Sequence, residues 1–473
     1  MEFLNLLDGK WRRGHGQRIA VTDPYSGETL GQVSAVTPEE AREALRAMEA
    51  RRPRADAIVP LWRRKELLEL VADNLESRRA DVLRALTHEA GKTVKESSIE
   101  IERAVDGLKA MAAALVSLEG TVVPMSSSRA GEGRLGFEVW EPAGIVVAIA
   151  PFNAPLNLVS SKVGAALAGG CAVAVKPPAE CPTPAAILAE CVLDAGWPEE
   201  LIAVLNGEAE VGQAMVAAPE PRVIAFTGSS GAGEAIARAA GLKRLILELG
   251  SIAPTIICDD ADVDDAVARL GRGAFGSAGQ ACISTQRLLV QEPLVEAVIE
   301  GLVDEAESLV VGDPSDAKTD VGPLINDRAA VRVRELLNSS RGDGARFHTG
   351  GRIEGRMVWP TVLSGLPPTS RICREEIFGP AVTIIPFVED DEAIEEANTG
   401  GFGLQAGVFT RDILRVNAFC TRLEYGSVQV NESSRVRLDG HAFGGLKRSG
   451  IGREGTQHLI RAMMEIKFVG VRL

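Results

Sequence analysis

The sequence predicts an α/β protein of more than one domain, and three observations lead to this prediction. The chain has 473 residues, long enough for two or three domains at the usual ~100–200 residues each. Hydrophobic residues make up 45% of it and charged residues 25%, close to globular proportions. Short apolar runs alternate with amphipathic segments, a pattern typical of a parallel sheet that helices cover on both faces.

Individual elements can be predicted in chain order. The segment 37–40, Thr-Pro-Glu-Glu, combines an N-cap hydroxyl, a proline at the first helical position and a glutamate three residues after the cap, so a helix begins there. Apolar residues spaced three and four apart over 61–86 and 97–116 predict two further helices. The apolar runs predict strands at 144–150, 171–175, 223–226, 245–247, 381–387 and 464–473, and the amphipathic segments predict helices at 157–168, 183–195, 263–276, 294–308 and 391–398.

Composition also limits the classes of partner that the protein is expected to bind. The net charge is −14, the wrong sign for a surface that neutralises nucleic-acid phosphates or anionic lipids. No apolar run approaches the ~18–20 residues that span a bilayer. The seven cysteines form no CxxC or CxxH pair, so we expect reduced thiols rather than a zinc site or a redox pair. We therefore expect a cytoplasmic protein without nucleic-acid, membrane or metal partners.

Glycine and cysteine positions point to a ligand site. The segment 223–241 runs from an apolar strand through a Gly/Ser turn into a helix, which aims backbone N–H groups at a phosphate. It lacks the full GxGxxG pattern, and tight packing explains such a turn equally well. Lys176 follows a predicted strand, at the sheet edge where ligands of open α/β sheets bind. Cys282 follows small residues in GSAGQAC, with a buried packing role as the alternative.

Short motifs spread along nearly the whole chain resemble those of the aldehyde dehydrogenase superfamily. They are PFNAPL at 151–156, KPP at 176–178, FTGSSGAG at 226–233, LELG at 247–250, GQACIS at 279–284, EEIFGP at 375–380 and FGGLKRSGIGREG at 443–455. The resemblance implies a Rossmann-type cofactor domain, an α/β catalytic domain and a β oligomerisation arm. These domains are expected at 1–119 with 144–250, at 251–453, and at 120–143 with 454–473.

The same resemblance implies a reaction, the oxidation of an aldehyde to its carboxylic acid with NAD(P)⁺. Cys282 matches the nucleophile, whose thiolate attacks the aldehyde carbon. Asn153 matches the amide that stabilises the resulting oxyanion, and Glu248 matches the general base that activates water to hydrolyse the thioester. Lys162 is similar to a lysine near that base, with a helix-surface role as the alternative.

The resemblance also implies cofactor-binding residues. Lys176 is similar to the lysine that binds the adenine ribose, and Glu180 lies close to it in the chain. The third position after Lys176, often glutamate in NAD-specific members, is Ala179 here, which leaves NAD and NADP open with NAD slightly favoured. The other implied residues belong to the pyrophosphate turn and the nicotinamide side: Gly228, Ser229, Gly233, Glu376, Phe378 and Phe152.

Two arginines could form a local cationic pocket for the substrate. A guanidinium suits phosphate, phosphonate or carboxylate oxygens, and Arg103 and Arg437 are the candidates, with pairing to a neighbouring acid as the alternative for each. His441 is a further candidate contact. Ala281 stands where phosphate-aldehyde members can carry arginine, which argues against this pocket. We expect a small polar or anionic aldehyde, phosphonate- or phosphate-bearing rather than of the succinate-semialdehyde or plain aliphatic kind.

Other function classes have less support. Coenzyme-A-acylating relatives generally lack a glutamate at the position of Glu248. A Cys-His hydrolase needs a histidine as base, and none of the five histidines lies in a motif-like setting. A non-catalytic binding protein has no need of Cys282, Glu248 and Asn153 together. Because a two-stranded arm is marginal alone, we expect a homodimer or homotetramer.

Overall fold

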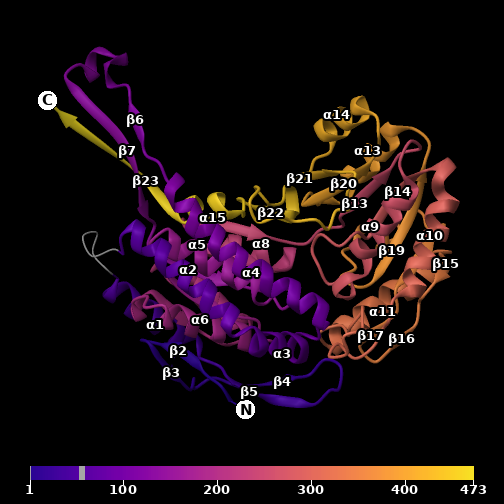
Figure 1. The fold of residues 1–473 in the computed structure, drawn as a ribbon, viewed down its shortest axis with the longest axis horizontal. Coiled ribbons are helices and arrows are strands. Elements are labelled where there is room, and N and C mark those ends of the chain that lie inside the picture. The colour runs from indigo at the N-terminus through magenta and orange to yellow at the C-terminus, as the bar shows by residue number, and fades with distance from the viewer. Residues whose placement is uncertain (1, 53–58) are drawn as a thin grey trace.

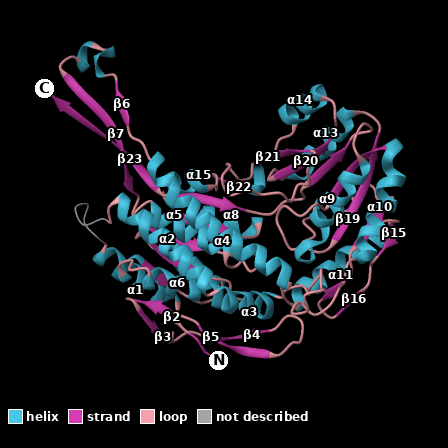
Figure 2. Ribbon diagram, in the orientation of Figure 1, coloured by secondary structure: helices cyan, strands magenta, loops and turns pink. Residues whose placement is uncertain are grey.

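Two open sheets flanked by helices, together with one projecting arm, make up the protein (Figure 1) in the computed structural model, which describes residues 2–52 and 59–473. Residues 1 and 53–58, within the predicted range 1–119, lie outside the described residues. Helices and strands alternate along most of the chain (Figure 2), which confirms the predicted α/β class.

The first sheet has eight strands in the order β22-β12-β11-β8-β9-β10-β2-β3. Its central strands are parallel neighbours, so their carboxyl ends share one edge. The chain builds outward from β8 in both directions, and ligands of such sheets bind beside this reversal point. The central strands are β8 (Ile145–Ile149), β9 (Ala172–Lys176), β10 (Ile202–Val204), β11 (Pro221–Thr227) and β12 (Arg244–Glu248); β2 (Asn5–Leu7), β3 (Lys10–Arg12) and β22 (Gly450–Ile451) complete the edges.

Helices cover both faces of this sheet. Helix α1 (Pro38–Arg51) begins at the predicted capping box, in which Glu40 N donates to Thr37 Oγ1 at 3.1 Å and Thr37 N donates to the Glu40 carboxylate at 2.7 Å. The predicted helix 61–86 is two helices that meet at Arg78. The other helices of this body are α2 (Leu61–Ser77), α3 (Arg79–Ala90), α4 (Val94–Ala114), α5 (Asn157–Ala168), α6 (Thr183–Asp194), α7 (Ala209–Ala217) and α8 (Ser230–Ala239).

The second sheet has seven strands in the order β15-β18-β19-β14-β13-β20-β21. All are parallel except the edge strand β15, and separate apolar clusters fill its two faces. The strands are β13 (Pro254–Ile257), β14 (Arg287–Gln291), β15 (Arg346–Thr349), β18 (Thr361–Ser364), β19 (Ala381–Phe387), β20 (Gln405–Phe409) and β21 (Ser427–Val430); the helices are α9 (Val263–Phe275), α10 (Val295–Ser308), α11 (Asp327–Gly342), α12 (Arg371–Arg374), α13 (Asp390–Asn398) and α14 (Ile413–Arg422).

Two small sheets lie beside these bodies. Strands β1 (Glu2–Phe3), β4 (Arg18–Thr22) and β5 (Thr29–Ser34) form one near the N-terminus, over a separate apolar cluster. Strands β16 (Ile353–Glu354) and β17 (Met357–Val358) form a short hairpin.

Strands β6 (Thr121–Val123), β7 (Arg134–Pro142) and β23 (Met464–Arg472) form an antiparallel sheet that projects from the body (Figure 1). Its edge strand β23 exposes Ile466 and Phe468. Helix α15 (Thr456–Ala462) packs on α4 and α5 of the first body, and β22 pairs with β12 there. After the last strand of the second sheet, the chain therefore returns to the first body before it enters the arm. The domain boundaries stay predictions. No helix in the described residues is long and apolar enough to cross a membrane.

Glu89, at the end of α3, is a buried acid whose ionisation is expected to cost stability. Its carboxylate accepts the Thr183 N–H at 3.1 Å, and burial raises its pKa to about 7. Because the folded state holds this proton more tightly than the unfolded state, its stabilising effect is present below pH ~4.3 and is lost as pH rises through about 7. Between pH 5 and 8, Glu89→Gln should gain about 1–3 kcal/mol of unfolding free energy relative to wild type. Urea unfolding of both proteins at pH 5 and at pH 8 measures this difference in unfolding free energy. The same pH dependence of unfolding free energy in the two proteins would contradict the prediction.

Candidate active site

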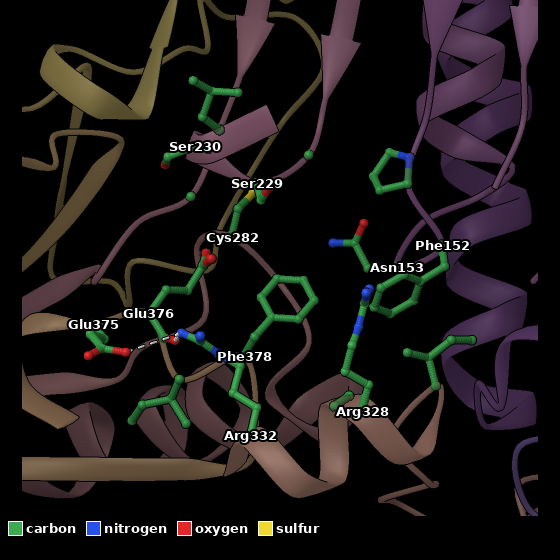
Figure 3. Close-up of a pocket in the computed structure, with 18 of the residues that line it drawn as sticks. Phe152, Asn153, Ser229, Ser230, Cys282, Arg328, Arg332, Glu375, Glu376 and Phe378 are labelled. Carbon is green, nitrogen blue, oxygen red and sulfur yellow. Dashed lines mark hydrogen bonds and ion pairs between the residues drawn. The ribbon is translucent and has the colours of Figure 1, made fainter. Parts of the chain in front are cut away.

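A cavity of about 920 Å³ lies where the two bodies meet. Its walls include residues that follow β8, β11 and β12 of the first sheet, together with Cys282 and side chains of α11 from the second body (Figure 3). The cavity therefore opens at the carboxyl edge of the first sheet, beside its reversal point, where a ligand site is expected. Its volume lies within the usual range of ~300–1,000 Å³ for small-molecule sites.

Cys282 reaches this cavity on a loop with an unusual backbone. Ser277 and Ala278 both have φ 51°, and Gly279 continues the left-handed turn at φ 69°. A Cβ on Gly279 would lie 2.1 Å from the carbonyl oxygen of Gly379, so only glycine fits there. Cys282 is a free thiol that lines the cavity, whereas most of the other cysteines are buried in the packing.

The Cys282 thiol is held in its protonated form by its surroundings. Burial raises its pKa to about 12, while the positive charge of Arg437 opposes the shift. A thiol is a much weaker nucleophile than a thiolate. Attack on a carbonyl therefore needs a base that takes the thiol proton.

Glu248, the last residue of β12, supplies a carboxyl group at the cavity wall. It is buried, and within the described parts of the chain neither of its carboxylate oxygens has a hydrogen-bond partner. Burial raises its pKa well above the ordinary range, and repulsion from Glu454 adds to the shift. A Cβ on Gly444 would lie 2.8 Å from Glu248 Oε1, so glycine there leaves room for this carboxyl group. Such a group accepts protons readily near neutral pH.

Glu454 forms a buried charge cluster behind Glu248. Its two oxygens lie 2.8 Å from Lys162 Nζ and 2.8 Å from the Arg437 guanidinium. Although burial opposes ionisation, these cations hold the Glu454 pKa at about 2. Lys162 also donates to Thr227 Oγ1 at 2.7 Å, beside Glu248 in the neighbouring strand. Lys162 is thus fully buried rather than on a helix surface.

Arg437 occupies a different place from the one expected for a substrate ligand. Its guanidinium pairs with Glu454 and lies 4.1 Å from the centre of the Phe443 ring. It does not line the large cavity. Sequence reasoning missed Glu454, although its motif FGGLKRSGIGREG had been identified. The local sequence does not show that Lys162, 292 residues away, is its partner.

Asn153 lies in the loop between β8 and α5 and lines the cavity with Cys282. In Figure 3 the two side chains extend into the same opening from opposite sides. The buried Asn153 Oδ1 has no hydrogen-bond partner among the described residues. The carbonyl oxygen of Asn153 accepts a hydrogen bond from Lys92 Nζ at 3.0 Å. Lys92 thus holds the backbone of Asn153, while no described residue holds the side-chain oxygen.

The first turn of α8 faces the cavity and fits a phosphate group. Ser229 caps this helix, accepting the Ala232 N–H at 3.3 Å. Gly228, Ser229 and Ser230 line the cavity, and the buried Ser230 Oγ has no partner in the described chain. Free N–H groups at a helix N-terminus bind phosphates well. Gly233 has a packing role instead. A Cβ there would lie 2.4 Å from the Leu249 side chain, so glycine allows α8 to pack closely against Leu249.

Glu376 and Phe378 of the second body line the cavity across from Phe152, which lies next to Asn153 on the first body (Figure 3). Glu376 accepts the Ser251 N–H at 3.1 Å, and burial raises its pKa to about 7. Phe378 has φ 52°, and its ring meets the ring of Phe152 edge-on at 6.0 Å. A Cβ on Gly250 would come within 2.8 Å of Glu376 Oε2. These features leave a flat, partly apolar space beside a carboxylate, which fits a nicotinamide and its ribose.

Lys176 and Glu180 mark the far end of this site. Glu180 lines the cavity, whereas Lys176 is buried at the end of β9, donates to the Pro177 carbonyl at 3.3 Å and has a pKa lowered by burial. Two further cavity residues, Arg328 and Arg332 of α11, were missed because exposed helix arginines carry no distinguishing pattern. Arg332 donates to the Glu376 carbonyl at 2.6 Å.

Arg103 and His441 already have partners within the chain. The Arg103 guanidinium lies 3.1 Å from Asp439 Oδ1. His441 Nδ1 lies 2.8 Å from the Ala442 carbonyl oxygen, and Nε2 accepts the Leu438 N–H at 3.3 Å. His441 thus ties its own loop together with both ring nitrogens.

Arg435 was missed, although it lies two residues before Arg437. It donates to the Gly276 carbonyl at 2.5 Å and to Ser277 Oγ at 3.0 Å, at the start of the loop that carries Cys282. Burial lowers its pKa, and among the described residues no carboxylate lies within ion-pair distance. Arg435 is therefore a partly buried cation at the Cys282 loop, and the charge of Glu96 opposes the lowering of its pKa. Arg435, like Arg437, is not among the residues that line the large cavity.

Comparisons with known proteins agree with this geometry. The model of the aldehyde dehydrogenase family matches residues 11–469. The chain is 41% identical over 451 residues to aspartate-semialdehyde dehydrogenase 1 of Pseudomonas canavaninivorans, covering 95% of this chain and 96% of that protein. It is 36% identical over 468 residues to 3-sulfolactaldehyde dehydrogenase of Priestia aryabhattai, covering 99% and 97%.

A solved structure shows the same fold. The glyceraldehyde-3-phosphate dehydrogenase of Methanocaldococcus jannaschii, crystallised with NADP, superposes with a TM-score of 0.92 at 35% identity over 97% of this chain and 100% of that one. The match spans both bodies and the cavity between them. The chain belongs to the aldehyde dehydrogenase family and is an NAD(P)-dependent aldehyde dehydrogenase.

Proposed function

We propose that this enzyme oxidises a small aldehyde with an anionic group to its carboxylic acid, and that water releases the product. The observation that carries the hydrolytic part is the unpartnered Glu248 carboxyl group in the cavity that holds Cys282. The anionic part is supported by Arg435, a partly buried cation that contacts the start of the Cys282 loop and has no carboxylate within ion-pair distance among the described residues.

The reaction begins with proton removal from Cys282. The Glu248 carboxylate accepts the thiol proton, and the sulfur attacks the aldehyde carbon to form a thiohemiacetal. The Asn153 amide and the Cys282 N–H donate hydrogen bonds to the oxyanion, and each such preorganised donor is worth ~2.7–4 kcal/mol. A bound oxidised nicotinamide would supply the hydride acceptor, and loss of the hydride would leave a thioester on Cys282. After Glu248 has released the thiol proton to solvent, its carboxylate takes a proton from water, which attacks the Cys282 thioester and releases the acid. Glu454, paired with Lys162, keeps a fixed charge behind this base.

The residues around the cavity also suggest how the dinucleotide is held. The α8 N-terminus with Gly228 and Ser229 binds the pyrophosphate. Glu376 would accept ribose hydroxyls beside Phe378 and Phe152, and Lys176 with Glu180 would bind the adenine ribose. Because Ala179 follows in place of the glutamate expected of NAD-specific members, the enzyme accepts NAD or NADP.

Three relatives support an anionic substrate. Aspartate semialdehyde, sulfolactaldehyde and glyceraldehyde 3-phosphate, named for those proteins, each combine an aldehyde with a carboxylate, sulfonate or phosphate. The charges of Cys282 and Arg103 both act on Arg435, so Arg435 is near the reacting sulfur and near Arg103. We therefore assign the anion pocket to Arg435 with Arg103, rather than to Arg437 or His441.

The arm suggests a homo-oligomer, and the free cysteines suggest a cytoplasmic enzyme. The exposed Ile466 and Phe468 on the edge strand β23 offer an apolar face and unpaired backbone groups to a second copy. We propose a homodimer or homotetramer that assembles through this sheet.

A panel of aldehydes tests the anion pocket. We expect Arg435→Met and Arg103→Met to lower kcat/KM about 10–100-fold for phosphate, phosphonate, sulfonate or carboxylate aldehydes, since hydrogen bonds to charged groups are worth ~1.5–3 kcal/mol. Turnover of neutral aliphatic aldehydes should stay near wild type. Assays with NAD and with NADP, each without coenzyme A, measure the reduced cofactor. Arg46→Met, on the exposed face of α1, is the control. Equal losses on neutral and anionic aldehydes would refute the pocket.

A further inference from the structure

Lys92 and Glu100 form a buried ion pair behind the loop that carries Asn153. Lys92 Nζ lies 2.7 Å from Glu100 Oε2, and the two side chains are only 11% and 4% exposed. Lys92 stands between two helix ends that fix its backbone: Gly91 closes α3 at φ 66°, and Thr93 caps α4 by accepting the Glu96 N–H at 3.3 Å. The backbone of Lys92 is thus held by the helix ends on both sides of it.

In the described chain, the other hydrogen bonds of these two side chains are to the segment from Asn153 to Asn157. Glu100 Oε1 accepts the N–H groups of Leu156 at 2.9 Å and of Asn157 at 3.1 Å, where α5 begins. Lys92 Nζ donates to the carbonyl oxygen of Asn153 at 3.0 Å. A single ion pair therefore anchors the catalytic loop at both of its ends.

Two observations point to orientation rather than stability as the purpose of this pair. Two buried charges stabilise a fold poorly, because desolvation offsets much of their attraction. The buried Asn153 Oδ1 has no hydrogen-bond partner in the described chain, so no hydrogen bond to that oxygen orients the amide and the position of the loop backbone matters more. A displacement of ~1 Å at a reacting centre can cost 10²-fold in rate.

We propose that Lys92 and Glu100 are positioning residues that direct the Asn153 amide toward the carbonyl oxygen of an aldehyde bound at Cys282. This inference rests on the proposed role of Asn153 in the oxyanion site. The ion pair acts through Asn153, so its effect belongs to the first half of the reaction and is the same for neutral and anionic aldehydes.

A double-mutant cycle tests this coupling. The readout is the rate of reduced-cofactor formation in the first turnover. We expect Asn153→Ala to lower it by ~10²–10³-fold, as for loss of an oxyanion donor, and Lys92→Met by about 10–100-fold. If Lys92 acts through Asn153, the double variant should be within about 3-fold of Asn153→Ala alone, because the coupled partner is already gone. Cofactor affinity should not change.

Three further variants keep the test independent of folding. Glu100→Gln retains an acceptor for the Leu156 and Asn157 N–H groups but removes the ion pair, and Lys92→Arg should recover part of the rate. Lys109→Met is the matched control and should behave as wild type, because Lys109, on helix α4 with Glu100, forms an exposed ion pair with Asp73 of α2. Thermal unfolding of each variant shows whether a lower rate results from a loss of folded protein.

Two outcomes would overturn the proposal, and they are distinguishable. If Asn153→Ala slows the first turnover but Lys92→Met and Glu100→Gln do not, or if the effects multiply in the double variant, the positioning role is wrong while the oxyanion role stands. If Asn153→Ala itself has no effect, the proposed role of Asn153 fails and the positioning role fails with it.

Discussion

Serine in place of Cys282 is expected to lower kcat for aldehyde oxidation by roughly 10⁴-fold or more, because a hydroxyl group is a far weaker nucleophile than a thiolate. The substitution preserves size, so the left-handed turn before it and the cavity wall stay in place. Reduced-cofactor formation, followed from the first turnover onward, measures the effect. Cofactor binding, followed by fluorescence, should be unchanged, since no dinucleotide-binding residue is altered.

A matched cysteine gives the control for this result. Cys420 is exposed on α14, away from the cavity, and Cys420→Ser should retain full activity. Alkylation of cysteine thiols should likewise inactivate the wild-type enzyme, whereas it should not lower the residual activity of Cys282→Ser any further. Activity above about 1% in Cys282→Ser, on the scale of the expected 10⁴-fold loss, would contradict the assignment of the nucleophile.

The sequence was sufficient to predict the fold class and five of the parallel strands, β8, β9, β11, β12 and β19, because buried parallel strands are short apolar runs that need no long-range information. The boundary between α2 and α3 was missed for a local reason. Arg78, at φ −94° and ψ 11°, interrupts the helix without proline or glycine, and apolar spacing continues across it. Periodicity reports the buried face and does not register such a break.

Charge partners were harder to predict than the nucleophile. Lys162 meets Glu454 from 292 residues away, and Arg103 meets Asp439 from 336 residues away. Such pairs depend on how the two bodies and α15 pack together, and the local sequence does not indicate this packing. Arg437 was expected at the substrate and Arg435 was overlooked, since in an irregular loop nothing in the sequence tells that Arg437 pairs with Glu454 while Arg435 contacts the start of the Cys282 loop.

The largest effect after that of Cys282 is expected for Glu248→Gln, which should lower steady-state kcat by ~10²–10⁴-fold because an amide cannot accept the proton of the attacking water. Since burial raises the Glu248 pKa, the wild-type kcat should rise with pH as this carboxyl group loses its proton. The groups that face it are Glu454, Lys162, Arg437 and Arg453. In Glu248→Gln this rise should be absent. A pH–rate profile of both proteins measures it.

The same variant separates hydrolysis from the other uses of a Cys282 thioester. With deacylation blocked, the acyl group should accumulate on Cys282 as added protein mass, and hydroxylamine, which attacks thioesters without a base, should restore turnover. Glu395→Gln on the exposed side of α13 is the control and should leave both readouts unchanged. If Glu248→Gln turns over normally with no acyl-enzyme, another group activates the water. If wild type itself needs coenzyme A for turnover, Glu248 serves only to take the thiol proton, and the thioester leaves on a thiol.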